Sequence, residues 1–204
     1  MILKQLFALA LFATIPAFAS ASFLVDFEKT WDYSNGDVNG YYNGGTAADG
    51  TTGPNLGVSF TGVSGLSNDT SFIYYSNAPS MQGIAYAYDT AFMNVLAGVD
   101  TGLSFFYSSP DAVIGAVKAY SGLDGTGNLL GSFNLAANSS GAYDTWTPVT
   151  FLFSGTAQSF DFTASANIVG LDNISTVPEP AILWLFGTGL AMFGAISRRG
   201  KALA

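Results

Sequence analysis

The sequence predicts an all-β fold for residues 22–176, built as a two-sheet antiparallel sandwich of the jelly-roll type. First, short segments rich in aromatic and β-branched residues alternate with clusters of Gly, Asn, Asp and Ser, which is typical of sandwiches. Second, none of these segments has the long 3.6-residue periodicity of an amphipathic helix. Third, the stretch DGTGN at residues 124–128 lies between two apolar runs and predicts a β-hairpin.

The expected strands follow one another along this body. The first covers residues 23–27, and a polar segment at 32–55 follows it. This segment is dense in Gly and Asn, which tolerate positive φ, so we expect turns and loops there. The other strands are expected at residues 56–61, 71–75, 84–88, 92–96, 102–107, 112–120, 129–135, 147–153, 158–163 and 168–174. A set of about ten strands in one domain of this length favours two packed antiparallel sheets.

The N-terminal segment, residues 1–21, has the pattern of a secretory signal peptide. Lys4 precedes an apolar stretch at residues 6–15, and small residues stand at Ala17, Ala19 and Ala21. This order predicts a signal helix that is cleaved after Ala19 or Ala21.

The C-terminal segment has a different pattern. Val177, Pro178, Glu179 and Pro180 precede an uncharged apolar run at residues 181–196, and a basic cluster closes the chain. Apolar runs that end in Lys and Arg are typical of membrane spans, so we expect a transmembrane helix at 181–197 and a basic cytoplasmic tail at 198–204. The run covers only about 24 Å of helix against about 30 Å of bilayer hydrocarbon, which makes it a marginal anchor.

This tail resembles the PEP-CTERM sorting signal of exported proteins in Gram-negative, exopolysaccharide-producing bacteria. The resemblance rests on Pro178, Glu179 and Pro180, the apolar helix, and the pair Arg198 and Arg199. It implies export through the secretion machinery, with removal of the signal peptide by signal peptidase, and transient anchoring in the inner membrane. It also implies processing near the motif by exosortase, a membrane-embedded cysteine transpeptidase-like enzyme. The protein would then reside in the cell envelope, on the cell surface or in the extracellular matrix.

The composition of the exported domain excludes several functions. Lys29 and Lys118 are its only basic residues beside thirteen acidic ones, a net charge of −11 that repels nucleic acid. The chain has no Cys and no His, so disulfides, Ser-His-Asp and Cys-His catalysis, and most zinc or copper sites are excluded. The domain also lacks Arg, the usual bidentate clamp for phosphate and carboxylate groups.

The first and last strands resemble those of jelly-roll carbohydrate-binding modules. The opening strand carries Phe27 and Glu28, and the closing strand carries the sequence GLDNI at residues 170–174. The resemblance implies that the two strands are neighbours and that Glu28 and Asp172 bind a structural Ca²⁺, with Asp26 as a third ligand. The alternative is that Asp and Asn stand in these loops because turns require them.

Aromatic residues in the Gly-rich region are candidates for ligand binding. Trp31, Tyr41 and Tyr42 lie there, where a side chain has less packing reason to be aromatic. Rings with polar tips suit the faces of sugars, so we predict that these three residues bind a ligand. Burial in the core is the alternative, since Tyr is common on half-buried β-structure.

These observations predict a non-enzymatic surface or matrix protein. Its role would be structural or adhesive, associated with exopolysaccharide, with weak glycan binding. One alternative is a secreted glycoside hydrolase or lyase that uses a pair of carboxylates. Asp26 and Asp161 lie between apolar residues as such acids do, but strand alternation would point them to solvent. A dedicated carbohydrate-binding module is a further alternative.

Overall fold

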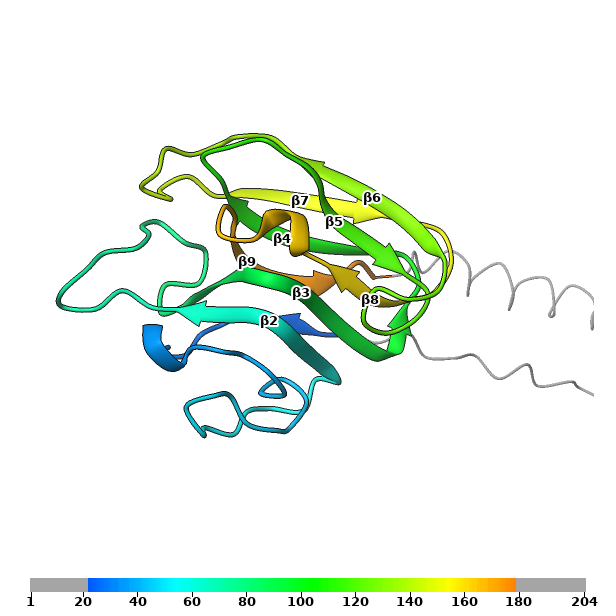
Figure 1. The fold of residues 1–204 in the computed structure, drawn as a ribbon, viewed down its shortest axis with the longest axis horizontal. Coiled ribbons are helices and arrows are strands. Elements are labelled where there is room, and N and C mark those ends of the chain that lie inside the picture. Colours follow the sequence, from blue (N-terminus) through cyan, green and yellow to red (C-terminus); the bar gives the residue numbers. More distant parts are fainter. Residues whose placement is uncertain (1–21, 179–204) are drawn as a thin grey trace, which may run out of the picture.

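The computed structural model describes residues 22–178, which form a β-sandwich (Figure 1). The predicted signal peptide at 1–21 and the predicted membrane helix at 181–197 lie outside these residues. Within 22–178, no helix has the length and apolar character needed to cross a membrane.

Nine strands and two short 3-10 helices make up the described fold. The strands are β1 (Leu24–Val25), β2 (Val58–Leu66), β3 (Ile84–Val99), β4 (Gly102–Ser108), β5 (Val113–Tyr120), β6 (Leu129–Leu135), β7 (Thr147–Leu152), β8 (Ala157–Asp161) and β9 (Gly170–Thr176). The 3-10 helices are η1 (Tyr33–Asn35) and η2 (Thr163–Ser165). Every strand pair is antiparallel, and the main path runs β6-β5-β8-β3-β9-β4-β7, with β1 on β9 and β2 on β3.

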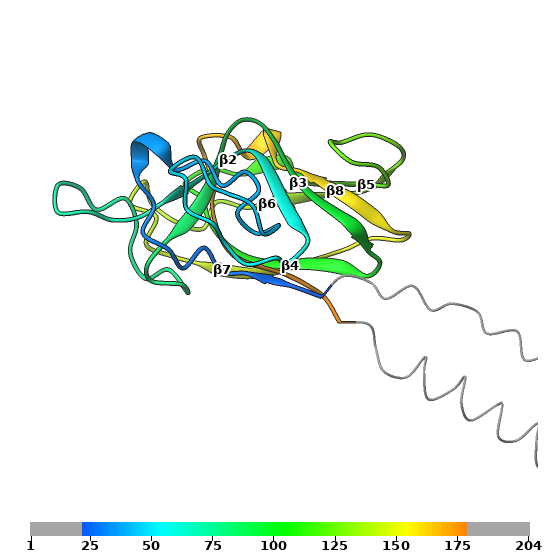
Figure 2. The ribbon, with the colours of Figure 1, turned by 90° about the horizontal axis from the view of Figure 1, so that it is seen from below.

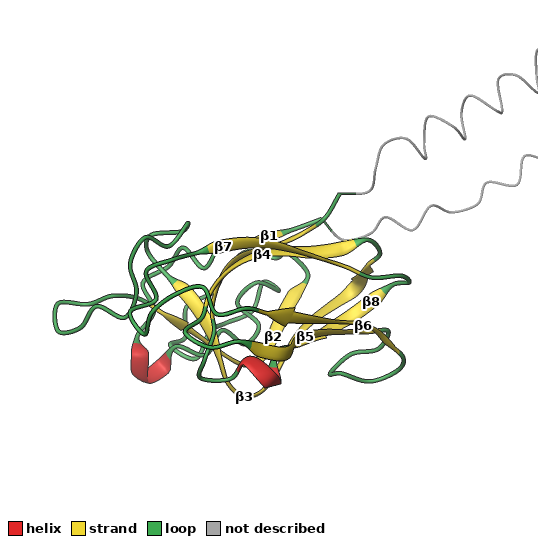
Figure 3. Cartoon of the chain, turned by 90° about the horizontal axis from the view of Figure 1, so that it is seen from above, coloured by secondary structure: helices red, strands yellow, loops and turns green. Residues whose placement is uncertain are grey.

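The strands form two layers that are joined by β3. Figure 3 shows β1, β4 and β7 in one layer and β2, β5 and β6 in the other. At its start, β3 pairs Ala85 with Leu171 of β9, and further along it pairs Met93 with Phe160 of β8. The predicted all-β antiparallel sandwich is therefore confirmed, but hydrogen bonds connect its two layers into one bent sheet.

The core lies between these layers. Alternate residues of β4, namely Leu103, Phe105 and Tyr107, are buried, as the two-residue period of a strand requires. Phe160 of β8 and Met93 of β3 face them from other strands and are fully buried. Each such side chain contributes about 1.5–3 kcal/mol through burial, which makes this cluster the main stabilising element of the fold.

Two strand predictions need correction. The strands expected at 84–88 and 92–96 are one continuous strand, β3, with 16 residues. The strand expected at 71–75 is wrong, because these residues lie in the loop between β2 and β3. Side chains at the start of that loop bind the backbone N–H groups that a neighbouring strand would otherwise bind.

The first and last strands are neighbours, as the resemblance to carbohydrate-binding modules implied. Leu24 pairs with Ser175 and Val25 with Ile174. The described chain therefore begins and ends at one corner of the sandwich, whereas the loop between β2 and β3 projects from the opposite end (Figures 1 and 2).

Candidate functional site

The three aromatic residues predicted to bind a ligand lie in or beside the core. Trp31 and Tyr42 are each 3% exposed, and Tyr41 is half-buried. The indole N–H of Trp31 donates to the carbonyl of Phe27 at 2.9 Å, and the ring of Tyr41 meets it edge-on at 5.5 Å. In this structure, Trp31 and Tyr42 have no ring face open to a ligand.

Glycines explain why Trp31 packs so closely. A Cβ atom at Gly65 would lie 2.1 Å from the indole ring, and one at Gly83 would lie 2.7 Å from it. Real Cβ atoms do not come this close, so the ring occupies space that only glycine leaves free. The sequence shows the glycines but not which ring they accommodate.

The loop at residues 67–83 exposes aromatic side chains instead. Two polar residues hold its backbone: Asp69 Oδ1 accepts from Phe72 N at 2.8 Å, and Asn68 Oδ1 accepts from Tyr74 N at 2.8 Å. Asn68 Nδ2 also donates to the carbonyl of Tyr75 at 2.8 Å. Asn and Asp commonly replace backbone partners in this way, which keeps the segment out of a sheet although it is apolar.

Apolar side chains of this loop lie beside a ring from η1. Phe72 is 59% exposed, Ile73 is 74% exposed and Tyr33 is 60% exposed. The rings of Tyr33 and Tyr74 are stacked with centroids 5.5 Å apart and planes 5° from parallel. The side chain of Asp32, which caps η1 by accepting from Ser34 N at 3.0 Å, fixes the backbone that carries Tyr33.

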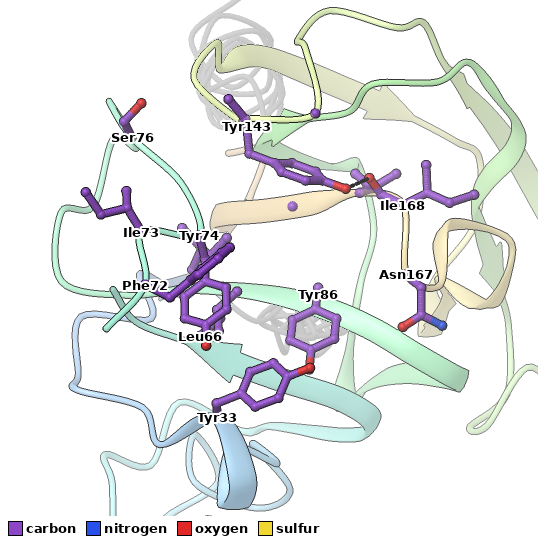
Figure 4. A pocket seen from close by; sticks show the side chains of 15 residues that line it. Tyr33, Leu66, Phe72, Ile73, Tyr74, Ser76, Tyr86, Tyr143, Asn167 and Ile168 are labelled. Atoms are coloured by element: carbon purple, nitrogen blue, oxygen red, sulfur yellow. Dashed lines mark hydrogen bonds between the residues drawn. The ribbon is translucent and has the colours of Figure 1, made fainter. Parts of the chain in front are cut away.

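Together these residues form one wall of a groove with a volume of about 640 Å³ (Figure 4). The opposite wall comes from the loop after β6 and from the turn before β9. The lining residues are Tyr33, Leu66, Phe72, Ile73, Tyr74, Ser76, Ile84, Tyr86, Gly141, Ala142, Tyr143, Asn167, Ile168, Val169 and Gly170. The groove thus lies at a loop end of the sandwich and is mainly aromatic and aliphatic.

The two walls are tied to each other. Trp146 donates its indole N–H to the carbonyl of Ser76 at 3.0 Å, and Ser76 N donates to the carbonyl of Tyr143 at 3.2 Å. Tyr143 in turn donates its hydroxyl to the carbonyl of Ile168 at 3.0 Å. Beneath them, Tyr75 is 2% exposed and packs edge-on against Trp146 at 6.4 Å. The groove is therefore formed before any ligand arrives.

The groove tyrosines stay protonated at neutral pH. Burial raises the pKa of Tyr74, Tyr86 and Tyr143 above the ordinary value, and nearby acidic groups add to it in each case. For Tyr74 the added charge is that of Asp69. A protonated phenol both donates and accepts hydrogen bonds, which suits the hydroxyl groups of a polar ligand.

The predicted calcium ligands lie elsewhere, under the base of the same loop. Asp172 is fully buried, and its Oδ2 accepts from Ser80 N at 2.7 Å. Glu28 Oε1 accepts from Gln82 N at 2.8 Å, so both carboxylates bind one short stretch of backbone. Asp26 is turned to its own neighbour, and its Oδ1 accepts from Glu28 N at 3.3 Å.

The carboxyl group of Asp172, next to Glu28, has a raised pKa. Burial raises the pKa of Asp172 to about 7, and the charge of Glu28 adds to the rise. Among residues 22–178, no cluster of three or more acidic side chains has a geometry that could hold a metal ion. Glu28 and Asp172 are therefore brought together, whereas Asp26 does not join them in such a cluster.

The C-terminal residues match a known signal. Residues 176–200 match the PEP-CTERM protein-sorting motif. The chain carries a PEP-CTERM sorting signal. It is thus an exported protein with a C-terminal sorting signal, as the resemblance implied.

The PEP-CTERM motif begins where the sandwich ends. Val177 N donates to the carbonyl of Gly102 at 3.0 Å, and Thr101 Oγ1 donates to the carbonyl of Val177 at 2.5 Å. Of the other motif residues, Pro178 is described and exposed, whereas Glu179, Pro180, Arg198 and Arg199 lie outside the described residues.

Similar solved structures include carbohydrate-binding modules. The C-terminal CBM6 module of the laminarinase LamC from Zobellia galactanivorans is 14% identical, with a TM-score of 0.38, covering 58% of this chain and 90% of the module. The module CBM6cm-2 of lichenase 5A from Cellvibrio mixtus, solved with cellotriose, is 11% identical. The match has a TM-score of 0.38 and covers 59% of this chain and 90% of the module.

An adhesin domain is also similar. The K1 cleaved adhesin domain of Lys-gingipain from Porphyromonas gingivalis is 14% identical, with a TM-score of 0.45, covering 78% of this chain and 99% of the domain. No curated protein sequence matches the chain significantly.

Proposed function

We propose that residues 22–176 form a non-catalytic glycan-binding domain of a surface or matrix protein. One observation carries the proposal: Tyr33, which is 60% exposed, stacks on the half-buried Tyr74 in a preformed groove beside the exposed ring of Phe72. Sugar rings have apolar faces and polar edges, so they stack on aromatic rings and bond to phenol and amide groups. The groove offers both, because Tyr143 and Asn167 also line it.

Preorganisation supports this role. Asn68 and Asp69 fix the backbone of the aromatic loop, and Trp146 ties it to the opposite wall. A ligand that binds here does not have to order the loop, which would otherwise reduce the affinity.

A hydrolase or lyase has less support. A glycosidase needs two carboxyl groups about 5–10 Å apart. Among the described residues that line the groove, none is Asp or Glu, and the adjoining hollow is lined by a single carboxylate, that of Asp37. Asp161, the other candidate acid, is engaged locally, since its Oδ1 accepts from Thr163 N at 2.8 Å.

The proposed place of action is the cell surface or exopolysaccharide matrix of a Gram-negative bacterium. Exosortase would process the tail near Pro178 and release or re-attach the domain there. The intact mass of the protein recovered from such a host tests this step. A product ending near the motif is expected, and a product ending at Ala204 would overturn the processing.

A structural Ca²⁺ at Glu28 and Asp172 belongs to the proposal as well. The donors fit this ion, because they are carboxylate oxygens, and no cationic side chain pairs with the buried Asp172 among the described residues. Two carboxylates provide fewer than the six to eight oxygens that Ca²⁺ prefers, so carbonyls and water would supply the rest. A melting temperature that rises with Ca²⁺ in the wild type, but not in Glu28→Gln, is expected. No Ca²⁺ effect in either protein would exclude the site.

The glycan-binding proposal is tested by titrating the domain with a panel of neutral oligosaccharides. Tyr33→Ala and Tyr74→Ala should each reduce affinity about tenfold, since a lost ring contact of this kind removes roughly 1.4 kcal/mol. Ile114→Ala is the matched control, because Ile114 is 79% exposed on β5 and does not line the groove. Unchanged binding in both tyrosine variants would overturn the proposal. New reducing ends in the mixture would favour the hydrolase.

A further inference from the structure

The aromatic groove continues into a second hollow with an acidic side chain. This hollow has a volume of about 380 Å³ and shares Tyr33, Tyr86 and Asn167 with the groove. Its other lining residues are Ser34, Gly36, Asp37, Ser64 and Tyr88. A ligand that lies on the aromatic rings can therefore extend to the carboxylate of Asp37.

Asp37 is held in place with one oxygen left for a ligand. The hydroxyl of Tyr88 donates to Asp37 Oδ2 at 3.0 Å, whereas Oδ1 accepts no hydrogen bond from any residue in the range 22–178. The backbone of Asp37 is fixed by a bridge to Ser64 of β2 and by its carbonyl, which accepts from Ala48 N at 2.9 Å. The carboxylate thus stands half-buried on a fixed backbone.

No positive charge offsets this carboxylate. The only basic residues in the described range are Lys29 and Lys118, and neither lines the groove or the hollow. Lys29 is paired with Asp49.

Acidic groups add to the raised pKa of tyrosines along both the groove and the hollow. Burial raises the pKa of Tyr74, Tyr86 and Tyr88. The charge of Asp37 adds to the rise at Tyr86 and Tyr88, and that of Asp69 adds to the rise at Tyr74. Asp89 adds to the rise at Tyr88. The potential is therefore negative along the path that a bound chain would take.

We propose that this combined site binds a glycan with free amino groups, that is, a partly deacetylated amino-sugar polymer. The inference rests on the proposed glycan-binding function and names its ligand class. One sugar stacks on the open side of the Tyr33–Tyr74 pair, and the ammonium group of a neighbouring sugar donates to Asp37 Oδ1. Tyr33 and Tyr86 line the same hollow, and aromatic rings also attract cations.

The charge also selects against other glycans. A uronate or sulfate group in the hollow would face Asp37 without any Lys or Arg to compensate, and like charges at short range repel. A hydrogen bond between an ammonium and a carboxylate is stronger than one between neutral groups. Because Asp37 is only half-buried, we expect the amine to raise affinity about tenfold rather than more.

The test compares four oligomers of equal length by calorimetry at a mildly acidic pH, at which the sugar amine is protonated. They are an oligomer of glucosamine, its N-acetylated form, a neutral glucan and a galacturonate. The glucosamine oligomer should bind about tenfold more tightly than the neutral two, and the galacturonate should not bind. Asp37→Asn should remove the tenfold preference and keep the affinity for the neutral oligomers. Asp124→Asn is the control, because it removes the same charge from the hairpin between β5 and β6.

The outcomes separate the two proposals. Equal affinity for the amino and N-acetyl forms, with no effect of Asp37→Asn, would overturn the amine inference and leave glycan binding intact. Failure of all four oligomers to bind would overturn both. A lysine-rich peptide that binds as tightly as the glucosamine oligomer, and equally to Tyr33→Ala, would show a site for cations and not for amino sugars.

Discussion

Two loop regions of this domain are rich in aromatic residues, and they differ in how many of these rings they expose to solvent. In residues 30–57, Trp31 and Tyr42 are each 3% exposed and belong to the main core. In residues 67–83, the ring of Phe72 is 59% exposed and that of Tyr74 is half-buried, whereas Tyr75 beneath them is 2% exposed. Tyr33 is the exception in the first region, because η1 carries it toward the second loop, where it stacks on Tyr74.

The difference comes from what surrounds each ring and not from the ring itself. Gly65 and Gly83 leave space above the backbone that the indole of Trp31 fills. In the second loop, Asn68 and Asp69 bind the backbone N–H groups of Phe72 and Tyr74, and the side chains of Phe72 and Ile73 are left exposed. Aromatic content alone therefore does not distinguish a core loop from a binding loop; the neighbouring Gly, Asn and Asp residues do.

The largest expected effect on stability is that of removing the buried ring of Trp31. Trp31→Ala should reduce the free energy of unfolding by about 3–5 kcal/mol, because it leaves a cavity and removes the hydrogen bond to Phe27. Urea denaturation followed by circular dichroism measures it. A loss below about 1 kcal/mol would mean that Trp31 is not a core residue and would restore it as a ligand-binding candidate.

The second effect concerns Asp172, which fixes the base of the exposed loop through Ser80. Burial raises its pKa from the ordinary 3.8 to about 7, so the folded state binds this proton more tightly than the unfolded state does. The stability from this carboxyl is fully present below pH 3.8 and is lost as the pH rises to about 7. The loss amounts to at most roughly 4 kcal/mol.

Thermal unfolding with a chelator present, across this pH range, checks the prediction for Asp172. The wild type should lose stability as the pH rises, and Asp172→Asn should flatten the profile because its amide does not titrate. The difference between the two proteins isolates Asp172 from the other carboxyl groups. If both profiles have the same slope, Asp172 titrates normally and its burial has no such effect.

Much of the fold could be predicted from local pattern. The strand expected at 102–107 is β4, because a two-residue period matches the pleat that buries Leu103 and Phe105. The pairing of the first and last strands, implied by resemblance, is also found in β1 and β9. These features depend on neighbours in sequence or on a recurrent arrangement of strands.

The candidate groove could not be predicted in this way. Residues 71–75 have the composition of a strand, and only the contacts of Asn68 and Asp69 with backbone N–H groups turn them into a loop. The stack of Tyr33 on Tyr74 joins residues that are far apart in the chain. The pair Asn68 and Asp69, shortly before the apolar run that begins at Phe72, was the available signal, since both residue types are common in turns.

A smaller effect on stability is expected at Asn68, which holds the backbone of the loop at residues 67–83. Asn68→Ala removes the acceptor of Tyr74 N and the donor to the Tyr75 carbonyl, and should cost about 1–2 kcal/mol. It should also reduce glycan affinity and speed hydrogen exchange at the amide of Tyr74. Asn134→Ala is the matched control, because Asn134 accepts from Gly115 N at 2.7 Å outside the groove. Equal glycan affinity in the two variants would mean that the loop keeps its shape without Asn68.

The smallest effect on stability is expected at Phe72. Its ring is 59% exposed, so Phe72→Ala should change the free energy of unfolding by less than about 0.5 kcal/mol. Affinity for the bound glycan should nevertheless fall, because the ring lines the groove beside Tyr74 at 4.7 Å. Met81→Ala is the control, since Met81 is 85% exposed in the same loop and does not line the groove. In this loop, binding would thus depend on a ring that folding does not require, which is the opposite of what we expect for Trp31. A large loss of stability in Phe72→Ala would remove that distinction.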